Sequence, residues 1–289
     1  MTAHPHWQAN APAERTLTVR DLRFARGGDR PRGVDPVASA WFAALSASFP
    51  RGEAMFVDAV KAFRDQVPPE LAAEIRDFIR QEVNHSREHI AFNRATKEAG
   101  YAMEEIDARV KSLVELTQSK PPLVQLAITC ALEHFTAMFA HEFLRDPAPL
   151  ATAGMGDPSL WQWHAVEEIE HKAVAYDTFL HVTRDWNARK RYALRAVIML
   201  RVTGRFLRHR SVDALDLLRQ DGITGWRAKW GLVRYLVGRP GILRKIFPAW
   251  LSWFRPSFHP WDHDDSALIA GWEAENANPP RTGEVAAAG

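Results

Sequence analysis

Two segments far apart in this 289-residue chain each carry a glutamate followed three residues later by a histidine. The pairs are Glu82 with His85 and Glu168 with His171. Residues three positions apart lie about 60° apart around a helix, so both side chains of a pair can reach one ion. Two such pairs, with one glutamate from each of two further helices, form the ligand set of a di-iron or di-manganese carboxylate site in a four-helix bundle. The spacing therefore predicts helices that converge on a paired metal.

Two lone glutamates stand where this ligand set requires them. Glu53 precedes the first pair, and Glu133 lies between the two pairs. The alternative for Glu53 is a carboxylate that stabilises a helix N-terminus through the helix dipole. Glu133 lies in the apolar run 128–139, where an unpartnered carboxylate is costly to bury and a metal would compensate its charge. We predict that both are metal ligands.

Each paired segment also offers a second histidine on the same helical face, His89 in the first and His164 in the second. A solvated, charge-rich face is the alternative, but apolar residues flank both faces and histidine is an uncommon choice for one. His89 and His164 exceed the simple ligand set, so each is a ligand, a partner of a ligand or an ordinary polar group. The predicted metal ligands are Glu53, Glu82, His85, His89, Glu133, His164, Glu168 and His171, with Glu167 on the flank of the second face as a further candidate.

The donor types indicate which metals and which chemistry to expect. Carboxylates with a few imidazoles suit Fe, Mn or Zn, and the single cysteine, Cys130, leaves no thiolate cluster. Two metal ions, with iron the favoured element, would allow O₂-dependent oxidation of a hydrophobic small molecule. A zinc or manganese pair would instead activate water for hydrolysis. A non-catalytic metal-binding or storage protein is the third hypothesis. The donor types alone do not choose between them, and of the three we favour the non-haem di-iron oxidoreductase.

Helical periodicity runs through most of the chain and strand-like alternation is nearly absent, so we predict an all-α fold. The predicted helical segments are 37–47, 52–66, 69–98, 102–118, 122–145 and 158–184, with a loop at 146–157 and further helices within 187–255. The predicted organisation is an N-terminal loop-rich segment (1–36), a di-metal helical bundle (37–184), a basic C-terminal helical cap (185–275) and a disordered tail (276–289).

The basic charge is concentrated in the last third of the chain. Residues 1–180 hold 19 Lys/Arg and 25 Asp/Glu, whereas residues 181–261 hold 17 Lys/Arg and four Asp. The basic region also contains Trp226, Trp230, Trp250 and Trp253. Helices that pack on the bundle and expose arginines to water explain this pattern, and so does peripheral contact with an anionic membrane. No recognised nucleic-acid-binding motif is present, so nucleic acid is not an expected partner.

Two features of the sequence favour the cytoplasm as the location of this protein. The N-terminal residues lack an apolar core of the kind found in secretory signals, and a single cysteine favours a reducing compartment. No run approaches about 18 uninterrupted apolar residues, the length that a membrane-spanning helix needs. We therefore expect a cytoplasmic protein, with contact at the inner membrane face as an extension of that hypothesis, and the oligomeric state stays open.

The chain resembles a bacterial family described as predicted metal-dependent hydrolases, over about residues 15–270. The matching motifs are Phe49-Pro50-x-Gly52-Glu53, Gln81-Glu82-x-x-His85-x-x-x-His89, Glu133-His134-Phe135-Thr136-Ala137, Trp163-His164-x-x-Glu167-Glu168-x-Glu170-His171-Lys172, Val174-Ala175-Tyr176-Asp177 and Phe258-His259-Pro260-Trp261-Asp262. This resemblance implies a metalloprotein. The ligand order also resembles that of ferritin-like di-iron oxygenases and desaturases, which implies a ferritin-like four-helix bundle with the basic helices added to it. The extra histidines depart from the plain ferritin-like set.

Overall fold

The computed structural model describes residues 17–24, 35–154 and 158–277. Every regular element in these residues is helical and none is a strand, so the all-α prediction is confirmed. The helices are α1 (Pro36–Lys61), α2 (Pro69–Glu98), α3 (Glu104–Gln118), α4 (Pro122–Arg145), α5 (Ala148–Ala153), α6 (Pro158–His171), α7 (Val174–Val182), α8 (Ala188–Gln220), α9 (Gly225–Val233), α10 (Ile242–Ser252) and α11 (Ser266–Asn276). Short helical turns occupy Arg64–Gln66, Arg234–Gly238 and Pro260–Asp262.

Several helix ends follow from local chemistry that is visible in the sequence. Pro69 and Pro122 are the first residues of α2 and α4, where a proline loses no intrahelical hydrogen bond. The Asp35 carboxylate accepts hydrogen bonds from the first backbone N–H groups of α1. Gly100 follows α2 with φ of 98°, a backbone conformation that ends helices and favours glycine. The predicted bounds of α2, α3 and α4 agree with the structure within about two residues.

Three predicted bounds are wrong. The segments 37–47 and 52–66 are mostly one helix, α1, which continues through Pro50 because tertiary packing along α2 and α8 holds both halves in line. The predicted helix 158–184 is broken at Lys172 and Ala173 into α6 and α7, where Lys172 Nζ bonds Asp265 Oδ2 at 2.6 Å. The predicted loop after α4 contains the short helix α5. The break carries no proline or glycine signal, whereas α5 is bounded by Pro147 and by Gly154, which adopts the left-handed conformation.

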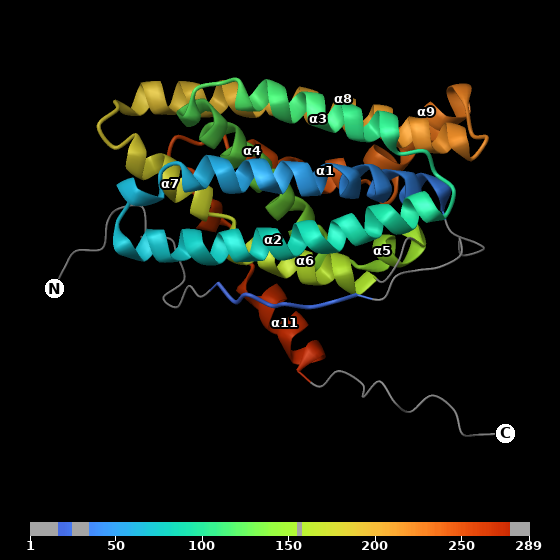
Figure 1. Ribbon diagram of the computed structural model, residues 1–289, viewed down its shortest axis with the longest axis horizontal. Coiled ribbons are helices and arrows are strands. Elements are labelled where there is room, and N and C mark those ends of the chain that lie inside the picture. Colours follow the sequence, from blue (N-terminus) through green and yellow to red (C-terminus); the bar gives the residue numbers. More distant parts are fainter. Residues whose placement is uncertain (1–16, 25–34, 155–157, 278–289) are drawn as a thin grey trace.

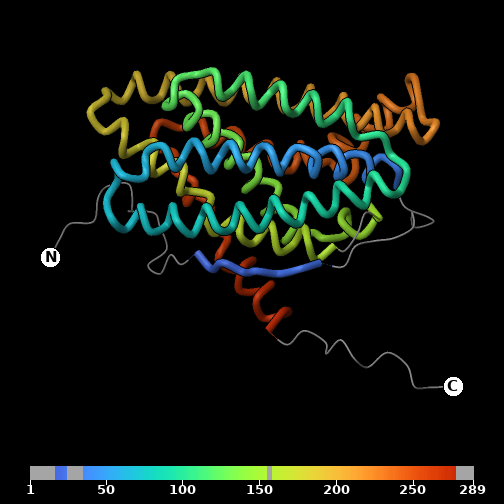
Figure 2. Tube along the Cα trace, viewed as in Figure 1, coloured from blue at the N-terminus to red at the C-terminus, as the bar shows by residue number. Residues whose placement is uncertain are grey.

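The site lies among four helices that pack against one another. Helices α1 and α2 form one pair and α4 and α6 the other, and contacts between α1 and α4 and between α2 and α6 join the pairs. Figures 1 and 2 show α3 and the long α8 running together along one side of α1. Helix α8 packs against both α1 and α4, so the basic region forms a further layer on this group of four.

Helix α4 is the one helix among the described residues that is long and apolar enough to cross a membrane, but 67% of its apolar window is buried inside the molecule. It supplies a central part of the core, including Leu126, Phe135 and Met138. Residues 17–24 run without regular structure past α2 and α6, with Leu17 buried (Figure 2). At the end of the predicted N-terminal loop, Asp35 and Pro36 are the N-cap and the first residue of α1. The other residues of that loop and nearly all of the predicted disordered tail lie outside the described residues.

Candidate metal centre

The four central helices bring six predicted ligands into one buried cluster. Helix α1 supplies Glu53, α4 supplies Glu133, and α2 and α6 supply the two Glu-x-x-His pairs. None of the six residues is more than 4% exposed. These six residues, which we call the central cluster, are Glu53, Glu82, His85, Glu133, Glu168 and His171.

Two glutamates of the central cluster lie between its two histidines. The Glu82 Oε1 and Glu168 Oε2 atoms each lie 3.5 Å from His171 Nε2. Their other oxygens face His85 Nδ1, at 3.7 Å for Glu82 Oε2 and 3.5 Å for Glu168 Oε1. Glu133 Oε2 lies 3.4 Å from His171 Nε2. The carboxylates of Glu82 and Glu168 are therefore placed to serve two neighbouring positions at once.

Three groupings of donor atoms are consistent with two neighbouring metal positions in the cluster. Within each grouping, one donor atom from every residue lies within 4.8 Å of the others. The groupings are Glu82 with Glu133 and His171, Glu82 with His85 and Glu168, and Glu53 with His85 and His164.

The atoms that face the centre of the cluster have no hydrogen-bond partner of acceptable geometry among the described residues. Burying unpartnered polar atoms is costly, whereas a bound cation would satisfy them together. A set of carboxylate oxygens and imidazole nitrogens fits Fe, Mn or Zn. These buried, unpartnered atoms are Glu53 Oε1, both carboxylate oxygens of Glu82 and of Glu133, Glu168 Oε2, His85 Nδ1 and His171 Nε2.

Hydrogen bonds on the outer side of the cluster orient both histidines. His85 Nε2 lies 3.0 Å from Glu167 Oε2, and His171 Nδ1 lies 3.0 Å from Gln81 Oε1. The Gln81 amide oxygen and the ionised Glu167 carboxylate can only accept, so they hold the ring proton on the outer nitrogen. The inner nitrogens, His85 Nδ1 and His171 Nε2, then present lone pairs to the centre.

A second set of contacts holds these acceptors in place. Glu167 Oε1 accepts hydrogen bonds from the Trp163 indole N–H at 3.2 Å and from the Arg20 backbone N–H at 2.8 Å. Gln81 Nε2 donates to Glu170 Oε2 at 2.9 Å. The sequence analysis placed Glu167 at the flank of the site. It assigned no role to Gln81 or Arg20, because the spacing of the ligands does not predict which residues support them.

His164 and His89 form a chain that leads away from the cluster. His164 Nε2 lies 2.8 Å from Glu168 Oε1 and 3.7 Å from Glu53 Oε1. Its Nδ1 lies 2.7 Å from His89 Nε2, and His89 Nδ1 in turn lies 2.9 Å from Ser46 Oγ. His164 thus shares a grouping with Glu53, whereas His89 belongs to none of the three.

The family model for "Predicted metal-dependent hydrolase" matches residues 18–264 of this chain. The chain belongs to this family. The matched span contains the whole central cluster, the Arg20 segment and the helices around them. No curated protein and no solved structure gave a significant match.

Electrostatics in this member of the family favour the uptake of cations. Burial, together with the neighbouring carboxylates, raises the pKa of Glu53, Glu82 and Glu133 well above the ordinary value for glutamate. Burial acts on Glu168 in the same direction, but the charge of His171 and a hydrogen bond with His164 lower its pKa well below the ordinary value. Crowded carboxylates of this kind cannot all ionise unless positive charge lies between them.

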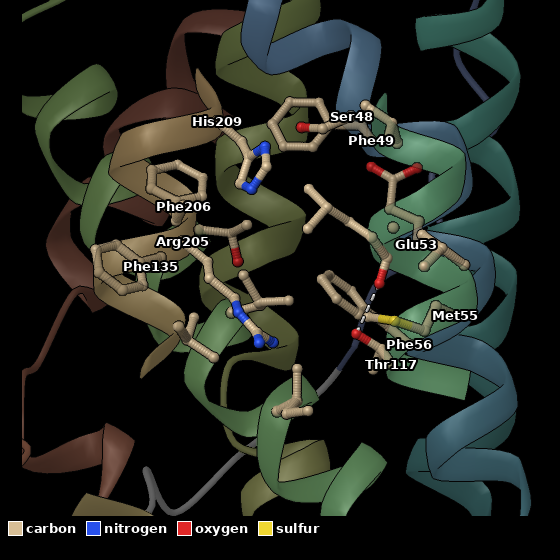
Figure 3. Close-up of a pocket in the computed structure, with 18 of the residues that line it drawn as sticks. Ser48, Phe49, Glu53, Met55, Phe56, Thr117, Phe135, Arg205, Phe206 and His209 are labelled. Atoms are coloured by element: carbon tan, nitrogen blue, oxygen red, sulfur yellow. Dashed lines mark hydrogen bonds between the residues drawn. The ribbon is translucent and has the colours of Figure 1, made fainter. Parts of the chain in front are cut away.

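A large cavity borders the central cluster at Glu53. Its volume is about 360 Å³, and it lies between α1, α3, α4 and α8 (Figure 3). The lining is mostly apolar, with Phe49, Phe56, Phe135 and Phe206 among the wall residues. Glu53 is the one carboxylate in this lining as the structure describes it, so the cavity joins an apolar space to the polar cluster.

Proposed function

We propose that this protein is an enzyme whose central cluster binds two metal ions, with iron favoured over manganese or zinc. The observation that carries the proposal is the convergence of buried, unpartnered donor atoms from α1, α2, α4 and α6. The order of the donors along the chain, a glutamate, a Glu-x-x-His pair, a glutamate and a second pair, resembles that of ferritin-like di-iron proteins and supports this assignment.

The geometry suggests a role for each group. Glu82 and Glu168 would bridge the two positions, while Glu53 and Glu133 would each complete one of them. His164 would complete the position nearest Glu53 or hold the Glu168 carboxylate through its hydrogen bond. His89 would orient His164, and Glu167 would orient His85.

We further propose that the reaction is O₂-dependent oxidation of a hydrophobic small molecule. A pair of ferrous ions would supply electrons for the reduction of O₂. The apolar cavity beside Glu53 supports this reaction class, because its walls would hold an apolar substrate and exclude water from the cluster.

Hydrolysis is the second candidate, and the family's description supports it. In that case the metal pair would lower the pKa of a bound water, and Glu53 would face the substrate in the cavity. A non-catalytic metal-binding protein is the third candidate. The three differ in the metal they retain and in their response to O₂.

Anaerobic purification, metal analysis and controlled exposure to O₂ test these candidates. Two irons per chain and a transient optical band on exposure to O₂ would support the oxidase. Two zinc or manganese ions without a response to O₂ would favour hydrolysis. Bound metal with neither an O₂ response nor hydrolytic activity would favour the non-catalytic candidate.

Substitution of the ligands tests the site itself. Glu82→Ala and His171→Ala should each lose most of the bound metal. Glu98→Ala, which removes an exposed carboxylate from the same helix as Glu82, is the matched control and should retain it. Full metal content in both ligand variants would refute the metal site and with it all three candidates.

A further inference from the structure

The cavity beside Glu53 combines an apolar interior with a cationic rim. Helix α8 contributes two adjacent stripes of side chains to it, each repeating at the four-residue spacing that places residues on one helical face. The apolar stripe is Ile198, Val202 and Phe206, and the polar stripe is Arg201, Arg205 and His209. An amphipathic face of this kind is ordinary at a protein surface, but here both stripes line the same cavity.

The opposite walls extend the apolar surface. Helix α4 lines the cavity with Ile128, Leu132, Phe135 and Phe139, which recur at helical spacing along one face. Helix α3 adds Val110, Leu113 and Val114. A ligand that fills this space must therefore bury a substantial hydrocarbon portion.

The rim cations lack acidic partners. Arg201, Arg205 and Lys120 are exposed and line the cavity, and none forms an ion pair within the described ranges of the chain. Glu53, the carboxylate in the lining, lies on the α1 side, whereas Figure 3 shows Arg205 and His209 on the α8 side. The positive charge at the rim is therefore available to an anion from outside the protein.

We propose that the cavity binds an anionic amphiphile with a single apolar chain. Arg201, Arg205 and Lys120 would hold the anionic head at the rim, and the chain would lie along α4 and α8 and pass Glu53. This inference rests on the proposed function and names its substrate class. It also implies that the reaction takes place on the chain, away from the head, because the rim cations and Glu53 lie on different walls.

Phe49 stands between this cavity and the inner histidines. Its ring lines the cavity, and it also lines a much smaller space of about 20 Å³ that reaches His164 and Glu168. The Phe49 ring centroid lies 5.0 Å from that of His164 and 4.6 Å from that of His89. Phe49 would therefore limit how far the chain can approach the cluster.

Calorimetric titration of the metal-loaded protein with decanoate tests the proposal. We expect one decanoate per chain, much weaker binding of butanoate, and weaker binding of decanol, which has the same chain length and no charge. Each added methylene should tighten binding by about threefold to fourfold until the cavity is full. Decyl phosphate serves as a second probe, and tighter binding than decanoate would support the proposal and assign a phosphate head.

Variants separate the rim from the apolar wall. Arg205→Gln and Arg201→Gln should each weaken decanoate binding by about tenfold and leave decanol binding unchanged. Arg208→Gln is the matched control, because Arg208 is an exposed arginine of α8 outside the cavity lining. Leu132→Trp should block both ligands by filling the cavity, and Thr136→Phe on the same wall repeats this test if the first variant does not fold.

Equal decanoate binding in the Arg201→Gln, Arg205→Gln and Arg208→Gln variants would overturn the proposal. Unchanged binding in a folded cavity-filling variant would also overturn it. Metal content measured on the same samples separates the two levels of inference. If the protein retains metal but does not bind decanoate, the amphiphile proposal is refuted and the metal centre stands. If the protein binds decanoate but fails to take up metal, the proposed metal centre is refuted and the ligand class stands.

Discussion

Gln81 and Glu167 perform the same task for the two histidines of the central cluster with different chemistry. Each accepts a hydrogen bond from the outer ring nitrogen of one histidine, at 3.0 Å in both cases. Gln81 is neutral, whereas burial raises the pKa of Glu167 to about 8 despite hydrogen bonding to the Arg20 backbone. Above about pH 8, where Glu167 is ionised, the two metal positions would therefore differ in the charge behind their histidines, which is a basis for unequal metal affinities.

The stability of the metal-free protein should fall as the pH rises from 6.5 to about 8.5. Glu53, Glu82, Glu133 and Glu167 have folded-state pKa values above the ordinary 4.5. The folded chain then binds more protons than the unfolded chain, and the free energy of unfolding decreases with pH. This contribution is complete below pH 4.5 and is lost as the pH passes through the folded-state values. Burial lowers the pKa of His85, His89 and His134, which adds stability as the pH rises through the ordinary histidine value of about 6.5, so little of this opposing effect lies in the upper part of the range.

Thermal unfolding of the metal-free protein at the two pH values measures this effect. We expect Glu167, with its pKa of about 8, to contribute a loss on the order of 2 kcal/mol, which lowers the Tm by about 3 °C in a protein of this size, and the other three carboxyls to add to it. The Glu167→Gln variant should show a smaller loss because it removes one of the titrating carboxyls. Saturation with metal should remove most of the dependence, and a Tm that rises with pH in the metal-free protein would contradict the prediction.

At the scale of elements, the extended segment 17–24 braces the outer side of the site. The Thr18 backbone N–H donates to Glu170 Oε2 at 3.0 Å, and the Arg20 backbone N–H donates to Glu167 Oε1. The Arg20 guanidinium also pairs with Glu170 and Glu273 at 2.8 Å each, which ties the segment to α6 and α11. This segment therefore fixes the residues that orient His85 and His171.

Arg20→Ala should loosen the segment and weaken metal binding by about tenfold, in the range found for outer partners of metal ligands. Arg23→Ala is the matched control, because Arg23 lies in the same segment but hydrogen-bonds Asp21 and the Leu22 backbone. Competition with a coloured chelator would measure the affinity of both variants. Equal affinities in Arg20→Ala and Arg23→Ala would show that the segment does not support the site through this arginine.

Sequence spacing predicted which ligand candidates meet, because the positions of a Glu-x-x-His pair on a helix follow from local geometry alone. Local signals such as Pro69, Pro122 and Gly100 likewise located helix ends. The continuity of α1 through Pro50 and the break after His171 depend on contacts with distant elements, which periodicity does not report. Glu170 illustrates the same limit, since the ligand spacing gives it no role, yet it bonds Gln81 and the extended segment.

At the scale of the whole molecule, the basic region keeps most of its charge free of the bundle. Among the ion pairs of the described residues, two join 181–261 to an acid of residues 1–180 through a basic side chain of the later region: Lys245 lies 3.0 Å from Asp146, and His259 lies 2.9 Å from Asp177. Pairing with the acidic bundle therefore does not account for the excess of positive charge. Helix α9 adds a surface with Trp226 72% and Trp230 62% exposed, and exposed aromatic residues beside cations mark contact surfaces.

We propose that this surface contacts the anionic inner face of a membrane, where an amphiphilic substrate would also be found. Sedimentation with phosphatidylglycerol vesicles at low salt should recover the protein, and high salt should release it, because screening weakens attraction between exposed charges. Phosphatidylcholine vesicles should bind less of the protein.

Replacing both Trp226 and Trp230 with alanine should reduce vesicle binding by about fivefold or more, since both indoles would lose contact with the interface. Leu116→Ala, which removes an exposed apolar side chain from α3, is the control. If neutral and anionic vesicles recover the protein equally, or if the recovery does not depend on salt, the proposed membrane contact is wrong. The basic helices would then have a structural role only.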